Sequence, residues 1–259
     1  MAITAAAGNK AASNGAVGSI ACGSFNTTNS GRIVVVVVLL DNTLSVSTVL
    51  DTSGTATYSL IAALDVSSTL RIEYWRSDNP ATKTGDVITA TLASGTTPMA
   101  IAAEQYTGDV GLLTGTSTFN GSDIYPYGTK PMAFQADWII TLIGWNGAST
   151  DTLTAEIGTI RQSGVGAAGA AGVAIIDQTE TVAAALDNQA KLNNSRTWGS
   201  IVMGLQGSST TWTIVGYTGV LPLYEPPTVA PGTMPSGGGG GILPPAGDGQ
   251  IFPPTVRPY

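Results

Sequence analysis

The side chains able to perform chemistry in this sequence are mainly carboxylates, because histidine is absent from it. Two facing carboxylic acids are what a glycoside hydrolase requires. Glu73 and Glu104 are the candidates, since each lies in a β-like run among apolar neighbours. Strand alternation places Glu73 on the same face as Trp75, and by the same rule Glu104 shares a face with its own aromatic neighbour, Tyr106. We favour the plainer interpretation, in which each acid faces solvent or pairs with Arg32, Arg71 or Arg76.

A glycine-rich run also matches the spacing of a nucleotide-binding motif. Residues 164–169 read Gly-Val-Gly-Ala-Ala-Gly, which fits G-x-G-x-x-G. A dinucleotide site needs a helix directly after this motif and an acid about 20 residues further on. Here Gly172 to Ile176 looks like another strand instead. The sequence therefore predicts a loop between two strands and no nucleotide site.

The composition excludes several other kinds of site. Without histidine there is no Ser-His-Asp triad and no histidine metal ligand. With Cys22 as the single cysteine, neither an intrachain disulfide nor a cysteine-rich zinc site can form. No acidic run has the spacing of an EF-hand calcium loop. We therefore expect no catalytic, cofactor-binding or metal-binding residues, no cofactor, and no enzymatic activity.

The charge balance argues against nucleic acid and membrane partners. The 259 residues carry 10 Lys and Arg against 17 Asp and Glu, a net charge of −7, and nucleic-acid binding needs a clustered cationic face. The most apolar run, Ile33 to Leu40, is far shorter than the roughly 20 residues that span a bilayer. The start, Met1-Ala2-Ile3-Thr4, lacks the basic region of a secretory signal. We expect synthesis in a host cytoplasm without signal-directed export.

The elements that would position these residues are short strands. Thr and Val are abundant, and β-branched side chains suit a pleated surface. Turn signals separate the apolar runs, which is typical of a sandwich or barrel. Asn14-Gly15, Asn120-Gly121 and Asn146-Gly147 could supply positive φ, while 51–54 and 77–80 should be loops. The expected strands are 33–40, 70–76, 87–92, 99–106, 138–145, 153–160, 172–176, 198–205 and 211–217.

One stretch resembles a helix. Residues 181–192 place Asp187 and Lys191 at i and i+4, which supports a short helix there.

The composition changes near residue 221. Ten of the 14 prolines lie in residues 221–259, together with the five-glycine run Gly237 to Gly241. Such a segment builds neither a ladder nor a helix. We expect a β-sandwich domain over 1–220 and an extended Pro/Gly-rich arm over 221–259 whose sparse apolar side chains anchor it to a partner: Leu223, Tyr224, Ile242, Leu243, Ile251, Phe252 and Tyr259.

The order of features resembles a jelly-roll-like β-sandwich domain found in phage structural proteins and bacterial surface proteins. The resemblance covers about residues 15–207. It rests on the segments 33–38, 47–54, 58–60, 71–75, 85–92 and 102–108, with 137–140 and 198–202 as further strands of the same pattern. It implies an all-β, antiparallel, jelly-roll-like fold. One sandwich hosts many functions, so these segments indicate the fold more than the activity.

With its arm, the chain also looks like the decoration, or cement, proteins of tailed-phage heads. That resemblance implies a virion structural protein on the capsid exterior. It implies a homo-oligomer, often a trimer, that contacts the major capsid protein and clamps neighbouring shell subunits. It supplies no catalytic residue. The alternative is a carbohydrate-binding or host-adhesion module of a phage tail or fibre, in which Tyr125, Tyr127 and Trp145 would stack on sugars.

Overall fold

The fold is all-β over the part of the chain that the structure describes. The computed structural model describes residues 3–54, 56–78, 80–108, 110–112, 116–129, 138–167, 169–179 and 187–207. These ranges contain strands and turns and no helix, and every strand pair in them is antiparallel. The strands belong to one compact unit, Met1–Trp212. The expected strand at 211–217, the arm and its seven anchor residues lie outside the described residues.

The first half of the chain forms a sandwich. Its larger layer, sheet A, has the order β1-β10-β4-β7-β6, with β1 (Thr4–Val17), β10 (Thr97–Thr107), β4 (Arg32–Leu39), β7 (Leu70–Ser77) and β6 (Ser59–Ser67). Two smaller sheets cover one face of sheet A. Sheet B has the order β2-β9-β5, with β2 (Ser19–Ala21), β9 (Thr89–Leu92) and β5 (Val46–Leu50); sheet C pairs β3 (Phe25–Thr27) with β8 (Lys83–Asp86).

The second half forms another sandwich. In its larger layer, sheet D, the order is β11-β19-β14-β17-β16, and β12 also pairs with β19. The strands are β11 (Val110–Leu112), β12 (Ser117–Gly121), β19 (Trp198–Gly207), β14 (Trp138–Gly147), β17 (Ala170–Thr179) and β16 (Thr159–Val165). Sheet E covers one face of sheet D with the order β13-β18-β15, from β13 (Tyr127–Thr129), β18 (Asp187–Leu192) and β15 (Leu153–Ile157).

The two sandwiches share one strand order. In each, the first strand lies beside the last, and the larger sheet then continues through the same sequence of strands: β1-β10-β4-β7-β6 in the first and β12-β19-β14-β17-β16 in the second. The smaller sheets also correspond, as β2-β9-β5 and β13-β18-β15. The sequence predicted one sandwich over residues 1–220, whereas the described part of that range holds two of matching topology.

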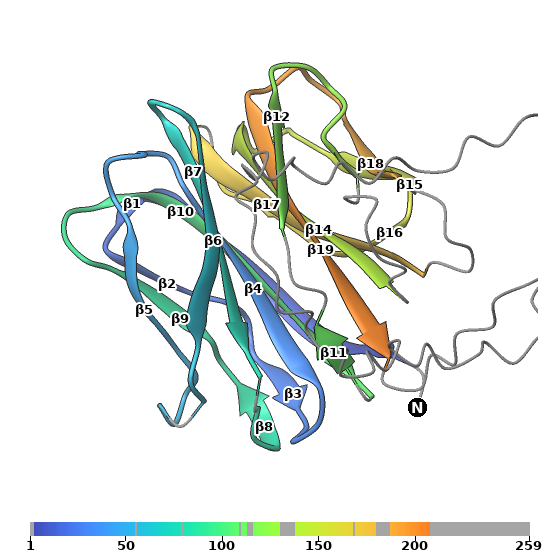
Figure 1. Ribbon diagram of the computed structural model, residues 1–259. Helices are drawn as coiled ribbons and strands as arrows, with labels where there is room; N and C mark the ends of the chain where they lie inside the picture. The colour runs from blue at the N-terminus through green and yellow to red at the C-terminus, as the bar shows by residue number, and fades with distance from the viewer. Residues whose placement is uncertain are drawn as a thin grey trace, which may run out of the picture. The chain divides into compact units, whose positions relative to one another are not determined.

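The sheets stack as four layers, with sheets A and D inside (Figure 1). The alternating side chains of β4 show that sheet A is covered on both faces. Ile33, Val35 and Val37 pack in the core that sheet A makes with sheets B and C. Their neighbours Val34, Val36 and Val38 pack in the core between sheets A and D. A third core joins sheets D and E. A strand buried on both faces reads as a continuous apolar run, which explains the valine series.

Glycine lets sheets A and D approach closely. Gly144 lies in β14 at the centre of sheet D. A Cβ atom added there would come within 2.8 Å of Val38 and 2.9 Å of Ile72 in sheet A. The absence of a side chain at this position therefore makes room for the side chains of the facing sheet.

Most of the strands expected from apolar runs are confirmed, but some local expectations are wrong. Residues 187–192 form strand β18, not the end of a helix, and the rest of that expected helix lies outside the described residues. The three Asn-Gly pairs lie within or at the ends of β1, β12 and β14, and none of their glycines has positive φ. Positive φ occurs instead at Gly54, in the predicted loop 51–54, and at Gly169, between β16 and β17.

The core between sheets A and D should contribute strongly to stability. We predict that Ile140→Ala, which empties a fully buried position in this core, lowers the free energy of unfolding by about 2–5 kcal/mol. Ile157→Ala is the matched control, because Ile157 is 41% exposed; it should change stability by less than about 0.5 kcal/mol. Urea unfolding measures both, and equal effects of the two variants would contradict this packing.

Candidate functional site

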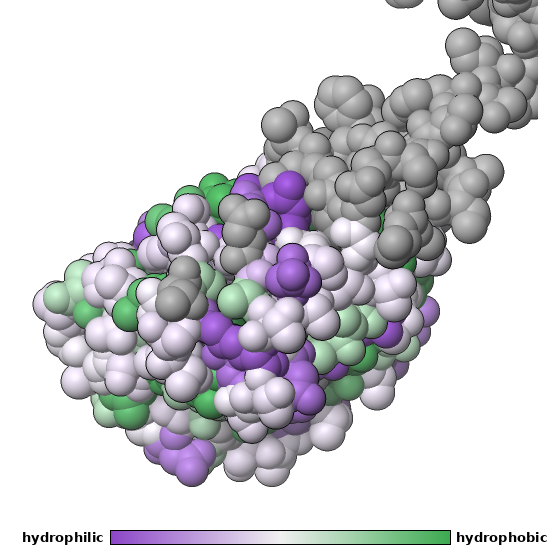
Figure 2. Space-filling view, turned by 90° about the horizontal axis from the view of Figure 1, so that it is seen from below, coloured by the Kyte–Doolittle hydropathy of each residue, from purple (hydrophilic) through white to green (hydrophobic). Residues whose placement is uncertain are grey.

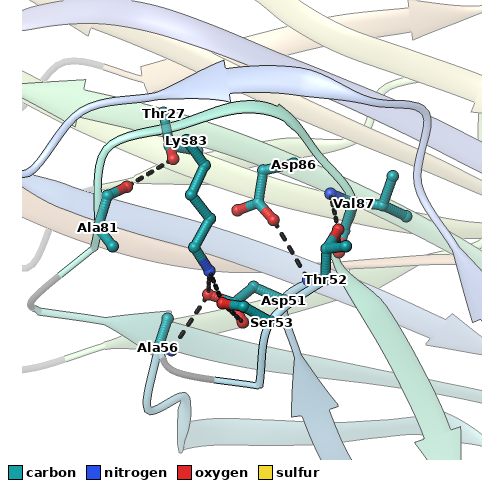
Figure 3. Close-up of polar contacts among 9 residues, drawn as sticks. All are labelled: Thr27, Asp51, Thr52, Ser53, Ala56, Ala81, Lys83, Asp86 and Val87. Atoms are coloured by element: carbon teal, nitrogen blue, oxygen red, sulfur yellow. Dashed lines mark hydrogen bonds and ion pairs between the residues drawn. The ribbon is translucent and has the colours of Figure 1, made fainter.

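A polar group with two buried carboxylates lies at the end of the first sandwich, where the turn after β5 meets β8. We call Asp51, Ser53, Lys83 and Asp86 the Lys83 site (Figure 3). Asp51 and Ser53 come from the turn, which closes through a hydrogen bond from the Gly54 amide to the Asp51 carbonyl, 3.0 Å. Lys83 and Asp86 are the two ends of β8, which pairs with β3. The site therefore joins segments that are separate in sequence.

The Lys83 amine is held by the turn. Its Nζ donates to Asp51 Oδ2 and to Ser53 Oγ. Asp51 Oδ2 also accepts from the Ala56 amide at 3.1 Å. The side chain of Asp51 is 1% exposed and that of Lys83 is 16% exposed. The pair is thus removed from bulk water at its carboxylate end.

The Lys83 site contains a second buried carboxylate, Asp86. Asp86 is 3% exposed, and its Oδ1 accepts from the Thr52 amide at 3.2 Å. Figure 3 shows its carboxylate directed into the space between Lys83 and Thr52. Burial raises the pKa of the Cys22 thiol to about 11, and the charge of Asp86 adds to the increase. Burial also raises the pKa of Tyr58, with further increases from Asp86 and Asp51. The charges of Asp86 and Asp51 therefore both raise the pKa of the buried Tyr58 hydroxyl.

A second polar group lies between sheets A and D, and we call it the interface cluster: Glu104, Tyr106, Arg161, Gln162 and Asp177. Asp177 Oδ2 accepts from Tyr106 Oη at 3.0 Å and from Arg161 Nε at 2.7 Å. Gln162 Nε2 donates to Glu104 Oε2 at 2.8 Å. Burial raises the pKa of both carboxyl groups, although Gln162 and Arg161 oppose the increase.

Glycine makes room for this cluster. Gly8 of β1 is the register partner of Glu104. A Cβ atom at Gly8 would lie 2.0 Å from Glu104 Oε2. The sequence named Glu104 and Tyr106 of this cluster but not Arg161, Gln162, Asp177 or Gly8. Gly8 gave no signal because β1 has a mixed composition and its strand character comes from pairing with β10.

The two glutamates proposed as a hydrolase pair do not face each other. Glu73 points toward sheet B, where its Oε1 accepts from the Val46 amide at 3.2 Å and from Arg71 Nε at 2.8 Å. Its Oε2 accepts from Trp75 Nε1 at 2.9 Å. Glu104 points to the opposite face of sheet A, toward Gln162. The hydrolase arrangement is therefore wrong, and the expected pairing of Glu73 with Arg71 is confirmed.

The three aromatic residues named as sugar-stacking candidates have different surroundings. Tyr125 and Tyr127 are 39% and 36% exposed. Tyr127 packs edge-on against Trp198, with ring centroids 5.5 Å apart. Trp145 is 1% exposed and belongs to the core between sheets D and E. Trp145 therefore cannot stack on a ligand, and the sequence missed its burial because β14 is covered on both faces.

Neither a group of metal ligands nor a membrane-spanning helix is found in the described residues. In the ranges given above, no three His, Cys, Asp or Glu side chains are grouped so that they could hold a metal ion. Within the same ranges, no helix is long and apolar enough to cross a membrane. No family model, curated protein or solved structure matches this chain.

The interface cluster predicts a pH dependence of stability. The pKa of Glu104 is raised in the folded chain, so folding favours the neutral acid. The resulting stabilisation is fully present below the ordinary value of 4.5 and is lost as pH rises through the raised pKa. Glu104→Gln keeps an acceptor for Gln162 and removes the titration. We expect this variant to gain stability over the natural chain as pH rises above 4.5.

Urea unfolding at a series of pH values measures this difference. Glu156→Gln is the control, because Glu156 is exposed in β15; it should leave the pH profile unchanged. A profile for Glu104→Gln that runs parallel to that of the natural chain at every pH would contradict the desolvated carboxyl group.

Proposed function

We propose that this chain is a virion structural protein, a capsid decoration or cement protein on the exterior of a phage head. It forms a homo-oligomer, a trimer by the resemblance noted above, and its arm clamps neighbouring shell subunits such as the major capsid protein. The first sandwich supports the jelly-roll interpretation, because its first and last strands pair and the chain crosses between facing sheets from β1 to β2, from β3 to β4 and from β4 to β5, although β6 and β7 pair within sheet A.

The observation that carries this proposal is apolar surface at sheet edges. Leu50 in β5 is 47% exposed, and Leu60 and Ile61 in β6 are 46% and 37% exposed. Among the described strands, β5 and β6 are the edges of sheets B and A. An edge strand offers unpaired backbone groups to another chain, and exposed apolar side chains favour such a contact. The cores behind these strands are already filled, so the edge side chains are available for assembly.

The surface as a whole fits protein contacts better than charged ligands. Only 10% of residues are charged. Figure 2 shows a face made mostly of residues of intermediate hydropathy, with hydrophobic patches scattered among them and hydrophilic residues gathered near its centre. Broad, weakly charged surfaces suit large flat contacts, whereas electrostatic steering needs concentrated charge.

The edge can be tested with the full chain. We expect the double variant Leu60→Glu/Ile61→Glu to lose self-association and binding to undecorated capsids by about a hundredfold or more, because each charge would be buried in the contact. Mass in solution and co-sedimentation with capsids measure the two properties. Ile157→Glu is the control on another edge strand. Unchanged association in the double variant would contradict the role of β6.

The arm has its own test. We expect a chain ending at residue 220 to lose capsid binding that the full-length chain shows in the same co-sedimentation assay, because the clamp is absent. If both chains bind equally, the arm is not the clamp. If neither chain binds any capsid, the decoration proposal is overturned.

One observation favours the alternative, a glycan-binding or host-adhesion module. Tyr125 and Tyr127 are close in sequence and both partly exposed, and Lys191 Nζ lies 5.7 Å from the ring centroid of Tyr125. Exposed aromatic faces beside polar groups suit sugar rings. A glycan array on the full chain, repeated with Tyr125→Ala, separates this function from the first: glycan binding that the substitution abolishes would favour adhesion.

A further inference from the structure

The Lys83 site places an amine and a carboxylate, the two groups that condense to form an amide, in contact. The Lys83 amine and the Asp51 carboxylate are in direct contact, and they lie 32 positions apart in the sequence. They are positioned by different elements, the turn after β5 and the start of β8. Both sides are held in place. The Ala56 amide holds the Asp51 carboxylate, the Gly54 amide closes the turn on the Asp51 carbonyl, and β3 holds β8 through the Thr27–Lys83 register pair. Because both groups are held in contact, the reaction needs no encounter of two separately diffusing reactants.

The pair is enclosed at its carboxylate end. The side chain of Asp51 is 1% exposed, and Asp86, the other carboxylate of the Lys83 site, is 3% exposed. Nearby, the Tyr58 hydroxyl is buried and has no hydrogen-bond partner in the described part of the chain. Burying charges costs several kcal/mol per ion unless pairing offsets it. Amide formation uses a neutral amine and a neutral acid, which one proton transfer from Lys83 to Asp51 supplies.

We propose that Lys83 and Asp51 form an intramolecular isopeptide bond, with Asp86 as the proton carrier. The neutral Lys83 Nζ attacks Cγ of the protonated Asp51 and forms a tetrahedral intermediate. Asp86 takes a proton from Nζ and delivers it to the hydroxyl of Asp51, which leaves as water. One C–N bond forms, one C–O bond breaks, and one water is released. No oxidant or external reactant takes part, and positioned carboxylates commonly carry such protons.

The bond would close the open end of the first sandwich. Asp51 follows β5 in sheet B, and Lys83 begins β8 in sheet C. A covalent tie between them joins two small sheets that otherwise meet through side chains and the connecting backbone. Cross-links of this kind stabilise mainly by restricting the unfolded chain. This inference stands on the site alone and holds whether or not the chain decorates a capsid.

Intact mass spectrometry of the full chain, purified in its folded form and then denatured, tests the bond. We expect a mass lower than the sequence mass by one water. Trypsin should leave the peptide bond after the acylated Lys83 uncut, and it should release fragment 33–71 joined to the fragment that begins at Ser77. A mass equal to that of the sequence would overturn the proposal. A missing water without joined fragments would also overturn it, because a cyclic imide elsewhere gives that result.

Variants separate the roles of the three residues. Lys83→Arg keeps the positive charge and should show the full mass, as should Asp51→Ala. Asp86→Asn should fold, as judged by circular dichroism, and should also show the full mass. Asp151→Asn is the matched control, because Asp151 is equally buried but pairs with the non-nucleophilic Arg196; its missing water should persist. A bond that still forms at the natural rate in Asp86→Asn would overturn the role of Asp86.

Discussion

The face-to-face packing of sheets A and D is the constraint on which the rest of the structure depends. It buries one face of each sheet, and the outer sheets cover the other face, so β4, β14, β17 and β19 are apolar or small at nearly every position. It also sets the spacing at which Gly144 is required and the depth at which Glu104 and Asp177 lose water. The outer sheets are covered on one face only, so their strands carry both buried and exposed side chains.

Buried charge in this chain serves to join elements. Asp51 pairs with Lys83, Asp151 with Arg196 and Asp177 with Arg161, each across two segments. Glu73 pairs with Arg71 within β7 and reaches β5 through the Val46 amide. Each carboxylate is almost fully buried, and each cation lies nearer the surface. A buried carboxylate without its partner would be costly, so these pairs fix the segments that supply them. Six carboxylates are buried among the described residues: Asp51, Glu73, Asp86, Glu104, Asp151 and Asp177.

The sequence predicted strands where burial dominates and failed where pairing or tertiary contact decides. The valine run of β4 and the apolar runs of β14 and β19 are read correctly from composition. β1 is rich in Ala, Asn and Gly, and only its ladder with β10 makes it a strand. In β18 the contacts override helical spacing: Asn188 donates to the Ile139 carbonyl at 3.1 Å, and Leu192 is buried. The Lys83 site had no sequence signal, because the turn after β5 and strand β8, which supply its residues, are distant in the sequence and meet only in the folded chain.

The repeated topology was also invisible in the sequence. Corresponding strands of the two sandwiches bury different residues, and their connections differ in length, so no fixed period links them. The packing of sheets A and D should nevertheless make both sandwiches one cooperative unit. Scanning calorimetry of the full chain tests this most directly. We expect a single transition whose calorimetric and van't Hoff enthalpies agree. Two separate transitions, one for each sandwich, would contradict it.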